Sequence, residues 1–306
     1  MELNNWMHYC EDPKSKRFVL CKINNLKEVG TWRYNVPYES LYCLNTSQVG
    51  NLIYFTGGGT SASESTPEQF FQITMRITIM PSMEIIIDKL ANMITPRANH
   101  AMEAINKHYI YVFGGTNSSG YLDSCEEYDI ETNNWKTIAK LSEKKKWMSV
   151  CAFNNKYLYS FGGCISDRNE VSKRIEYLDT TDNLAKIWKI VKLISGDDLV
   201  KSSFFIGAMN ISNSYILLFG GINKAEEEDG CVVFDPAKNT IEKQKGLLKR
   251  DSFYRTKYGV SNNQYAIVGC RDGDLHVYNE ETKKWGLMVK KIWNPKYEIA
   301  IKADTF

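Results

Sequence analysis

Four apolar segments of this chain each end in a pair of glycines, and no other feature constrains the fold as strongly. The segments are 52–58, 109–115, 157–163 and 215–221, and a fifth at 265–270 keeps one glycine. The glycines are Gly57, Gly58, Gly114, Gly115, Gly162, Gly163, Gly220, Gly221 and Gly269. Successive groups are 57, 48, 58 and 49 residues apart, which predicts a repeat protein with a unit of about 50 residues.

Each unit has the pattern of four antiparallel strands. The run before the glycines is aromatic and β-branched and too short for a helix, which indicates a buried strand. A second apolar segment precedes it across a polar turn such as Asn106-Lys107, so the two are predicted to form a hairpin. A polar loop then leads to a third strand with an aromatic residue and a fourth with Trp. The aromatic pairs are Tyr128 and Trp135, Tyr177 and Trp188, and Tyr278 and Trp285, whereas Phe234 is followed by Ile241 in place of Trp.

A single four-stranded sheet cannot bury both of its faces. Stacking the sheets face to face around an axis buries both and leaves only short edges. The paired glycines are expected to allow positive φ angles and a close approach of neighbouring backbone. The tryptophans are expected to pack between adjacent sheets. The sequence therefore predicts an all-β propeller.

The order Gly-Gly, then Tyr or Phe, then Trp about seven residues later resembles the Kelch repeat, and the resemblance covers nearly all of the chain. Counting units gives a six-bladed Kelch β-propeller with four antiparallel strands per blade, because 306 residues shared by six blades is 51 each. Five blades are predicted at 40–95, 98–141, 147–194, 203–248 and 252–290. The unit at 40–95 has no Trp, so its outer strands must come from 72–80 and 83–90.

The first blade is predicted to join both ends of the chain. Strand-like segments at 6–10, 18–23 and 32–34 supply three strands within residues 1–38. The alternating segment 297–302 supplies the fourth and closes the ring. The whole chain, 1–306, is thus expected to form one domain.

Charge and composition exclude several classes of function. The balance of 38 Lys and Arg against 36 Asp and Glu lacks the basic excess of a nucleic-acid binder. No apolar run reaches the roughly 18 residues of a membrane helix, and the start of the chain has no signal-peptide pattern. The eight cysteines form no Cys-x-x-Cys pair and are expected to be reduced core thiols of a cytoplasmic protein.

The sequence predicts no catalytic residue, metal or cofactor. Its four histidines, His8, His100, His108 and His276, are scattered through the repeat. Residues 57–59 do not have the context of a phosphate-binding loop. Some Kelch-like propellers are enzymes, so an oxidase-like or sugar-epimerase-like activity at the propeller mouth remains the alternative.

The resemblance implies a non-catalytic scaffold or adaptor that binds a protein or peptide, or a structural subunit of a large cytoskeletal assembly. The loops after the glycines vary while the strands repeat, as expected if those loops face a partner, although drift would look the same. The predicted mouth residues, Arg97, Lys145, Ser202 and Arg255, lie at or near the entry to inner strands. In Kelch adaptors an Arg at this place contacts acidic peptides through its forked guanidinium. The alternative is that Arg97 hydrogen-bonds neighbouring loop carbonyls.

Overall fold

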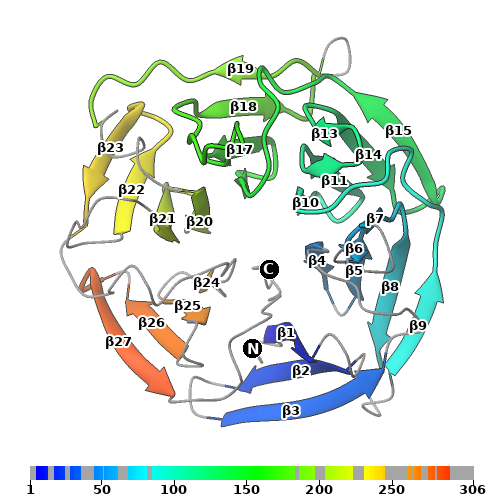
Figure 1. The fold of residues 1–306 in the computed structure, drawn as a ribbon. Helices are drawn as coiled ribbons and strands as arrows, with labels where there is room; N and C mark the ends of the chain where they lie inside the picture. The colour runs from blue at the N-terminus through cyan, green and yellow to red at the C-terminus, as the bar shows by residue number, and fades with distance from the viewer. Residues whose placement is uncertain are drawn as a thin grey trace.

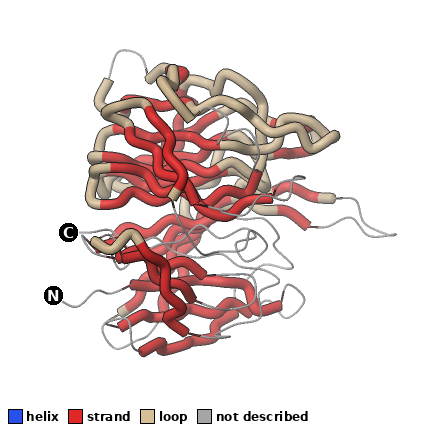
Figure 2. Tube along the Cα trace, turned by 90° about the vertical axis from the view of Figure 1, so that its left-hand side faces the viewer, coloured by secondary structure: helices blue, strands red, loops and turns tan. Residues whose placement is uncertain are grey.

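The computed structural model shows an all-β chain (Figures 1 and 2). It describes residues 5–12, 17–24, 28–35, 45–50, 52–60, 68–80, 85–182, 186–196, 204–222, 231–244, 261–262, 265–269, 275–279 and 281–289. Strands, turns and loops make up all of these residues, with no helix among them. Accordingly, this part of the chain offers no helix that is long and apolar enough to cross a membrane. The all-β prediction is confirmed.

Antiparallel sheets follow one another along the chain. The first has three strands, β1 (Asn5–Asp12), β2 (Arg17–Asn24) and β3 (Glu28–Asn35). The second has β4 (Asn45–Val49), β5 (Leu52–Thr56), β8 (Thr74–Ile79) and β9 (Ile85–Lys89). The third has β10 (Ala101–Ile105), β11 (Tyr109–Phe113), β14 (Cys125–Asp129) and β15 (Asn134–Ile138).

The remaining sheets repeat the same order. The fourth has β16 (Ser149–Phe153), β17 (Tyr157–Phe161), β18 (Glu176–Asp179) and β19 (Lys189–Ile190). The fifth has β20 (Phe204–Ile211), β21 (Tyr215–Ile222), β22 (Cys231–Asp235) and β23 (Thr240–Lys243). The sixth has β24 (Ser261–Asn262), β25 (Tyr265–Gly269), β26 (Leu275–Asn279) and β27 (Lys284–Val289). Two short ribbons, β6 (Gly59–Thr60) with β7 (Gln69–Phe70) and β12 (Thr116–Asn117) with β13 (Gly120–Tyr121), extend the loops after the glycines.

The sheets lie around a common axis, with their first strands near the axis and their last strands at the periphery (Figure 1). The first strands of the second to sixth sheets, β4, β10, β16, β20 and β24, contact one another in that order. Clusters of buried apolar side chains fill the space between consecutive sheets from the second to the sixth. These four-stranded sheets are consistent with a propeller, in which each sheet buries its faces against its neighbours.

The paired glycines allow each sheet to approach the segment that leads to the next one. Gly57 and Gly114 have φ angles of +64° and +54°, which favour glycine. A Cβ atom on Gly114 would lie 2.5 Å from the carbonyl oxygen of Lys145, and one on Gly57 would lie 2.3 Å from that of Arg97. Gly57 and Gly114 therefore have the positive φ angles and the close backbone contacts that the sequence predicts. In the fifth sheet, β21 instead continues through the glycine pair to Ile222.

The tryptophans pack between sheets, as predicted. Trp135 on β15 is 6% exposed and lies in the cluster between the second and third sheets. Its ring Nε1 donates to Thr74 Oγ1 at 3.1 Å and to the Ala91 carbonyl at 3.0 Å, both in the preceding repeat. Trp188 and Trp285 similarly meet Phe113 and Phe219 of the preceding sheets in edge-to-face contacts. Each tryptophan therefore joins its own sheet to the one before it.

The strand register shows that one of the predicted signature residues, Tyr177, does not hold the buried position on the third strand. Tyr128 pairs with Ile110 in the third sheet, and Phe234 and Tyr278 hold the same position in the fifth and sixth. In the fourth sheet that position belongs to Leu178, which pairs with Leu158, whereas Tyr177 pairs with Tyr159 and points to the opposite face. The aromatic signature predicts Tyr177 at this position, but an aliphatic side chain, Leu178, fills the buried position in the fourth sheet.

The N-terminal strands predicted within residues 1–38 are present as β1, β2 and β3. The outer strands predicted for the 40–95 repeat are present as β8 and β9. The closing segment 297–302, together with Ser202 and Arg255, lies outside the described residues.

Candidate partner-binding face

Two kinds of segment meet at the end of the sheets where the paired glycines lie. The first kind connects one sheet to the next, at 91–99 and 139–147. The second kind follows the glycines, at 116–124 and 164–175. Backbone bridges join them, Ala98 to Thr116 and Lys146 to Cys164. The amides of Gly58 and Gly115 donate to the carbonyls of Arg97 and Lys145, each at 2.9 Å. We call this end the glycine-end face.

Arg97 lies beneath this face. Its side chain is completely buried and forms an ion pair with Glu126 on β14, with 2.6 Å between Arg97 Nη2 and Glu126 Oε1. Arg97 Nη1 also donates to the carbonyls of Gly114 and Ser124 at 2.8 and 2.9 Å. The Glu126 carboxylate accepts the backbone amides of Ile94 and Thr95 as well. This pair therefore fastens the 91–99 connection onto the third sheet.

Lys145 repeats the arrangement one sheet later. Its ammonium group is completely buried and lies 2.7 Å from Glu176 Oε2 on β18. The amide of Ser142 donates to the other carboxylate oxygen at 2.8 Å. Burial of Glu176 disfavours its charge, but the ammonium of Lys145 and the hydrogen bonds of Ser142 outweigh that effect and lower the pKa of Glu176. Glu176 therefore stays ionised in the folded protein at neutral pH.

The structure thus gives Arg97 and Lys145 an internal role in place of the predicted contact with a partner. Neither charge reaches the surface, and the alternative for Arg97, hydrogen bonds to loop carbonyls, is what the structure shows. The two carboxylates that receive these cations, Glu126 and Glu176, were not identified from sequence. The sequence does contain a pattern that could have identified them. In these two repeats a Glu lies on the third strand, 12 residues after Gly114 and 14 residues after Gly162.

The glycine-end face carries an exposed combination of aromatic and cationic groups instead. Lys146 Nζ lies over the rings of Tyr121 and Trp147, 4.4 and 4.2 Å from their centroids. Tyr121 donates to Asp167 at 2.9 Å, and Arg168 beside it is exposed. Tyr121, Lys146 and Trp147 are each partly exposed. We call these five residues the aromatic patch.

Trp147 adopts an uncommon backbone conformation for a bulky residue, with φ of +58°. Asn99, two residues after Arg97, holds the equivalent place with φ of +56°. Hydrogen bonds fix the two segments together, since the Trp147 amide and its ring Nε1 donate to the carbonyl and side chain of Asn99 at 2.9 and 2.7 Å. The aromatic patch is therefore held in place by backbone as well as side-chain contacts.

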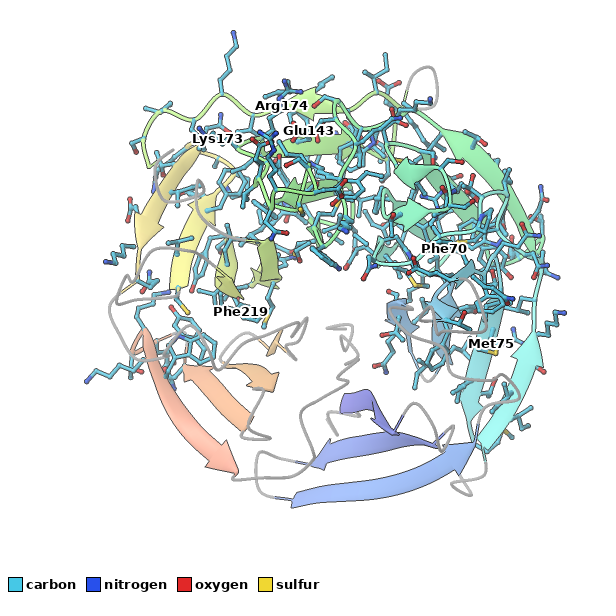
Figure 3. The ribbon with its side chains drawn as sticks, viewed as in Figure 1. Phe70, Met75, Glu143, Lys173, Arg174 and Phe219 are labelled. Atoms are coloured by element: carbon cyan, nitrogen blue, oxygen red, sulfur yellow. The ribbon has the colours of Figure 1, made fainter. Side chains whose placement is uncertain are left out.

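A charged cluster joins the 139–147 connection to the 164–175 segment, with 3.8 Å between Arg174 Nε and Glu143 Oε2. Figure 3 shows the labelled side chains of Glu143, Lys173 and Arg174 close together. Glu143 accepts a hydrogen bond from Ser172, and Arg174 Nη1 donates to Ser142 Oγ at 2.8 Å. Both lysine and arginine are exposed, so this part of the face can meet a charged partner.

The described residues include no cluster of three or more His, Cys, Asp or Glu side chains placed to hold a metal ion. His100, at the entry to β10, is buried, and its Nε2 lies 2.8 Å from Thr56 Oγ1 on the preceding sheet. This histidine therefore links two sheets.

Comparison with known proteins gives one family model and several relatives. The model of the KLHDC2/KLHL20/DRC7 Kelch-repeats domain matches residues 43–244. Alpha-scruin of Limulus polyphemus is 29% identical over 165 residues, which is 50% of this chain. Kelch-like protein 41a of Danio rerio is 35% identical over 27% of the chain, and Kelch-like protein 7 of Rattus norvegicus is 33% identical over 31% of it. The matched segments span 17%, 13% and 16% of these relatives, respectively.

Proposed function

This chain belongs to the Kelch-repeat family, and from that premise we propose that it is a non-catalytic module that binds a protein partner through the glycine-end face. Kelch-like relatives support an interaction role in general. The face, the partner and a scaffold or adaptor role are our proposal. Cys125 and Cys164 are buried thiols outside any disulfide, which fits a protein that works in a reducing compartment such as the cytoplasm.

The aromatic patch is the observation that supports this function. Tyr, Trp and Arg are the residues that most often dominate binding energy at protein interfaces. Tyr121, Trp147 and Arg168 offer all three within one face, and Lys146 lies between the two rings. The supporting segments are held by the buried ion pairs of Arg97 and Lys145, so a partner would meet a preorganised surface.

The test is a quantitative pulldown from native cell extract with mass spectrometry. The variant Lys146→Glu/Arg168→Glu reverses two charges of the aromatic patch, and Lys107→Glu is the control. Lys107 is exposed and lies in the turn between β10 and β11, at the end of the third sheet opposite Gly114. We expect the double variant to lose partners that wild type and control retain, with equal melting temperatures for all three. Equal recovery by the double variant would place the interface elsewhere.

We further propose a closed ring of six blades. Among the residues that the structure describes, the first sheet has three strands where each of the following five has four. The alternating pattern Tyr-Glu-Ile-Ala-Ile-Lys at 297–302 fits the missing strand. Ending the chain before Pro295 is then expected to expose a strand edge and cause unfolding or aggregation. An unchanged melting temperature and a monodisperse truncated protein would contradict ring closure.

A further inference from the structure

The fifth sheet has a smaller residue where neighbouring sheets have tryptophan. Trp135 pairs with Tyr128, and Trp285 pairs with Tyr278, at the start of the fourth strand. In the fifth sheet the same register pairs Ile241 with Phe234. The junction between the fourth and fifth sheets therefore lacks an indole ring.

The receiving surface for an indole is nevertheless repeated at that junction. Trp135 packs in one cluster with Val49 and Tyr54 of the preceding sheet and with Leu90-Ala91, which follow its outer strand. Trp188 packs in one cluster with Ile105 and Tyr111 and with Ile138-Ala139. The common receptor thus consists of the last residue of the first strand, a tyrosine on the second strand, and two residues at or just after the end of the fourth strand.

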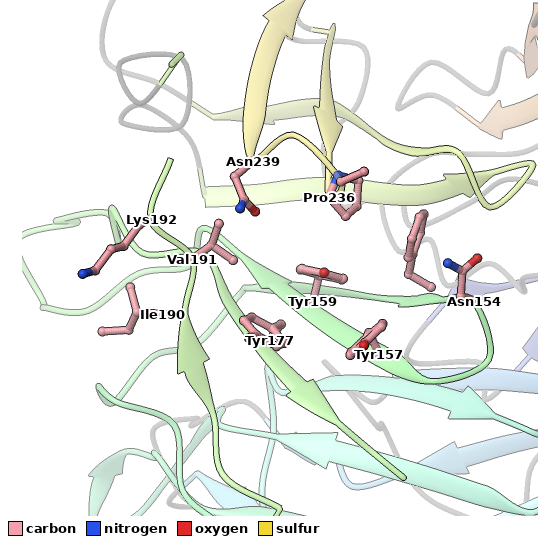
Figure 4. A pocket seen from close by; sticks show the side chains of 11 residues that line it. Asn154, Tyr157, Tyr159, Tyr177, Ile190, Val191, Lys192, Pro236 and Asn239 are labelled. Carbon is pink, nitrogen blue, oxygen red and sulfur yellow. The ribbon is translucent and has the colours of Figure 1, made fainter. Parts of the chain in front are cut away.

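Strand register identifies the same receptor on the fourth sheet as Phe153, Tyr159 and Val191-Lys192. Phe153 ends the first strand opposite Tyr157, as Ile105 does opposite Tyr109. The amide of Val191 donates to the Ile175 carbonyl at 2.8 Å, as that of Leu90 donates to Thr74 at 3.0 Å. All four receptor residues line one pocket, which Figure 4 shows from close by.

This pocket has the size and lining of a binding site. Its volume is about 530 Å³, within the roughly 300–1,000 Å³ of typical ligand pockets. Tyr157 and Tyr177 add aromatic surface, and the turn residues Pro236, Ala237 and Asn239 close the side toward the fifth sheet. Tyr177, which does not hold the buried core position, is therefore available to this pocket.

The rim of the pocket is apolar and basic. Ile190 lines it and is 52% exposed, and Ile194, whose amide donates to the Asn239 carbonyl, is 78% exposed. The exposed lysines Lys189 and Lys192 lie on the same segment. Asp179 and Asp235, in the adjoining turns, are paired with Lys156 and Lys238. A partner residue with a carboxylate would therefore be attracted to this rim.

We propose that this pocket, here called the indole pocket, binds a tryptophan side chain from an acidic linear segment of a partner protein. The chain itself shows what the receptor accepts, because an indole fills the equivalent position at two neighbouring junctions. Trp135 donates from Nε1 to the Ala91 carbonyl, and the Lys192 carbonyl holds the equivalent place in the register. The site lies between the fourth and fifth sheets, and none of its lining residues belongs to the aromatic patch.

The test uses the whole chain and the peptide acetyl-Asp-Glu-Trp-Glu-Asp-amide, with alanine replacing tryptophan in a control peptide. Binding is measured by calorimetry and by ¹⁹F NMR with 5-fluorotryptophan in the peptide. We expect wild type to bind the tryptophan peptide and not the alanine peptide. Ile241→Trp fills the pocket from within and should weaken binding by roughly thirtyfold, the effect of losing a hot-spot contact. Its melting temperature should stay equal or rise.

A second variant keeps the proposal testable if Ile241→Trp does not fold. Lys189→Glu changes an exposed side chain of the rim that does not line the pocket. It should weaken binding of the acidic peptide while leaving binding of neutral N-acetyltryptophanamide unchanged. Lys140→Glu is the matched control, because it lies beside a junction that Trp188 already fills, and it should bind both probes as wild type does. No binding to wild type, or equal binding by Ile241→Trp, would overturn the proposal. A wild-type dimer that becomes monomeric in Ile241→Trp would overturn it too, since the occupant would then be a second copy.

Discussion

Replacing Arg97 with alanine is expected to lower the free energy of unfolding by about 3–5 kcal/mol, the range for breaking a buried ion pair by removing one partner. The change would leave the buried Glu126 carboxylate without its cation and would remove the Arg97 donor from the carbonyl of Gly114. The carbonyl of Ser124 would lose one of its two donors and keep the Gly114 amide. It would also loosen the 91–99 connection, whose amides bind the same carboxylate. Denaturant titration of the purified variant measures the effect.

Two control variants distinguish the stability lost with the buried ion pair from the stability lost with any positive charge. Lys140→Ala removes an exposed cation 3.6 Å from Asp123 and should change stability by about 1 kcal/mol or less. Arg97→Lys should retain more stability than Arg97→Ala, because a lysine fills the equivalent place in the next repeat and reaches Glu176. If Arg97→Ala were no more destabilising than Lys140→Ala, the pair would contribute little to the fold.

Replacing Trp135 with alanine is expected to cost about 3–5 kcal/mol, because it opens a cavity between two sheets that cannot close independently. The ring is 6% exposed, contacts Tyr128 at a centroid distance of 5.0 Å and donates two hydrogen bonds to the preceding repeat. Denaturant titration again measures the loss. The control Ile94→Ala changes a side chain that is 53% exposed and should shift stability by about 0.5 kcal/mol at most. A loss below about 1 kcal/mol for Trp135→Ala would contradict its role as a contact between sheets.

The strands were predictable because their causes are local. An apolar run with aromatic and β-branched residues forms a buried strand wherever it packs, and a polar turn before it forms the hairpin. The glycine pairs were predictable for the same reason, since the positive φ at Gly57 and Gly114 is a property of the chain at that point. Even in the 40–95 repeat, which lacks Trp, the outer strands predicted at 72–80 and 83–90 are present as β8 and β9.

The candidate site was less predictable because it depends on pairing across the repeat. Arg97 and Lys145 carry charges, and charged side chains are exposed unless a partner is buried with them. Their partners, Glu126 and Glu176, lie 29 and 31 residues further along the chain, beyond loops of unequal length. The sequence spacing therefore could not pair each cation with its carboxylate. Tyr177 was misplaced for a related reason, since a one-residue shift of register moves a side chain to the opposite face of a sheet.

Backbone hydrogen bonds at the base of the 116–124 loop allow its sequence to change without loss of the fold. The Gly115 amide donates to the Lys145 carbonyl, and the Leu122 amide donates to the Gly115 carbonyl, so main-chain atoms hold both ends of the 116–124 loop. These atoms are the same whatever side chains the loop tip carries. Lengthening or replacing the tip therefore leaves the framework intact, as happens with the hypervariable loops of antibodies. Specificity in this chain can evolve, or be engineered by loop grafting, without a new fold.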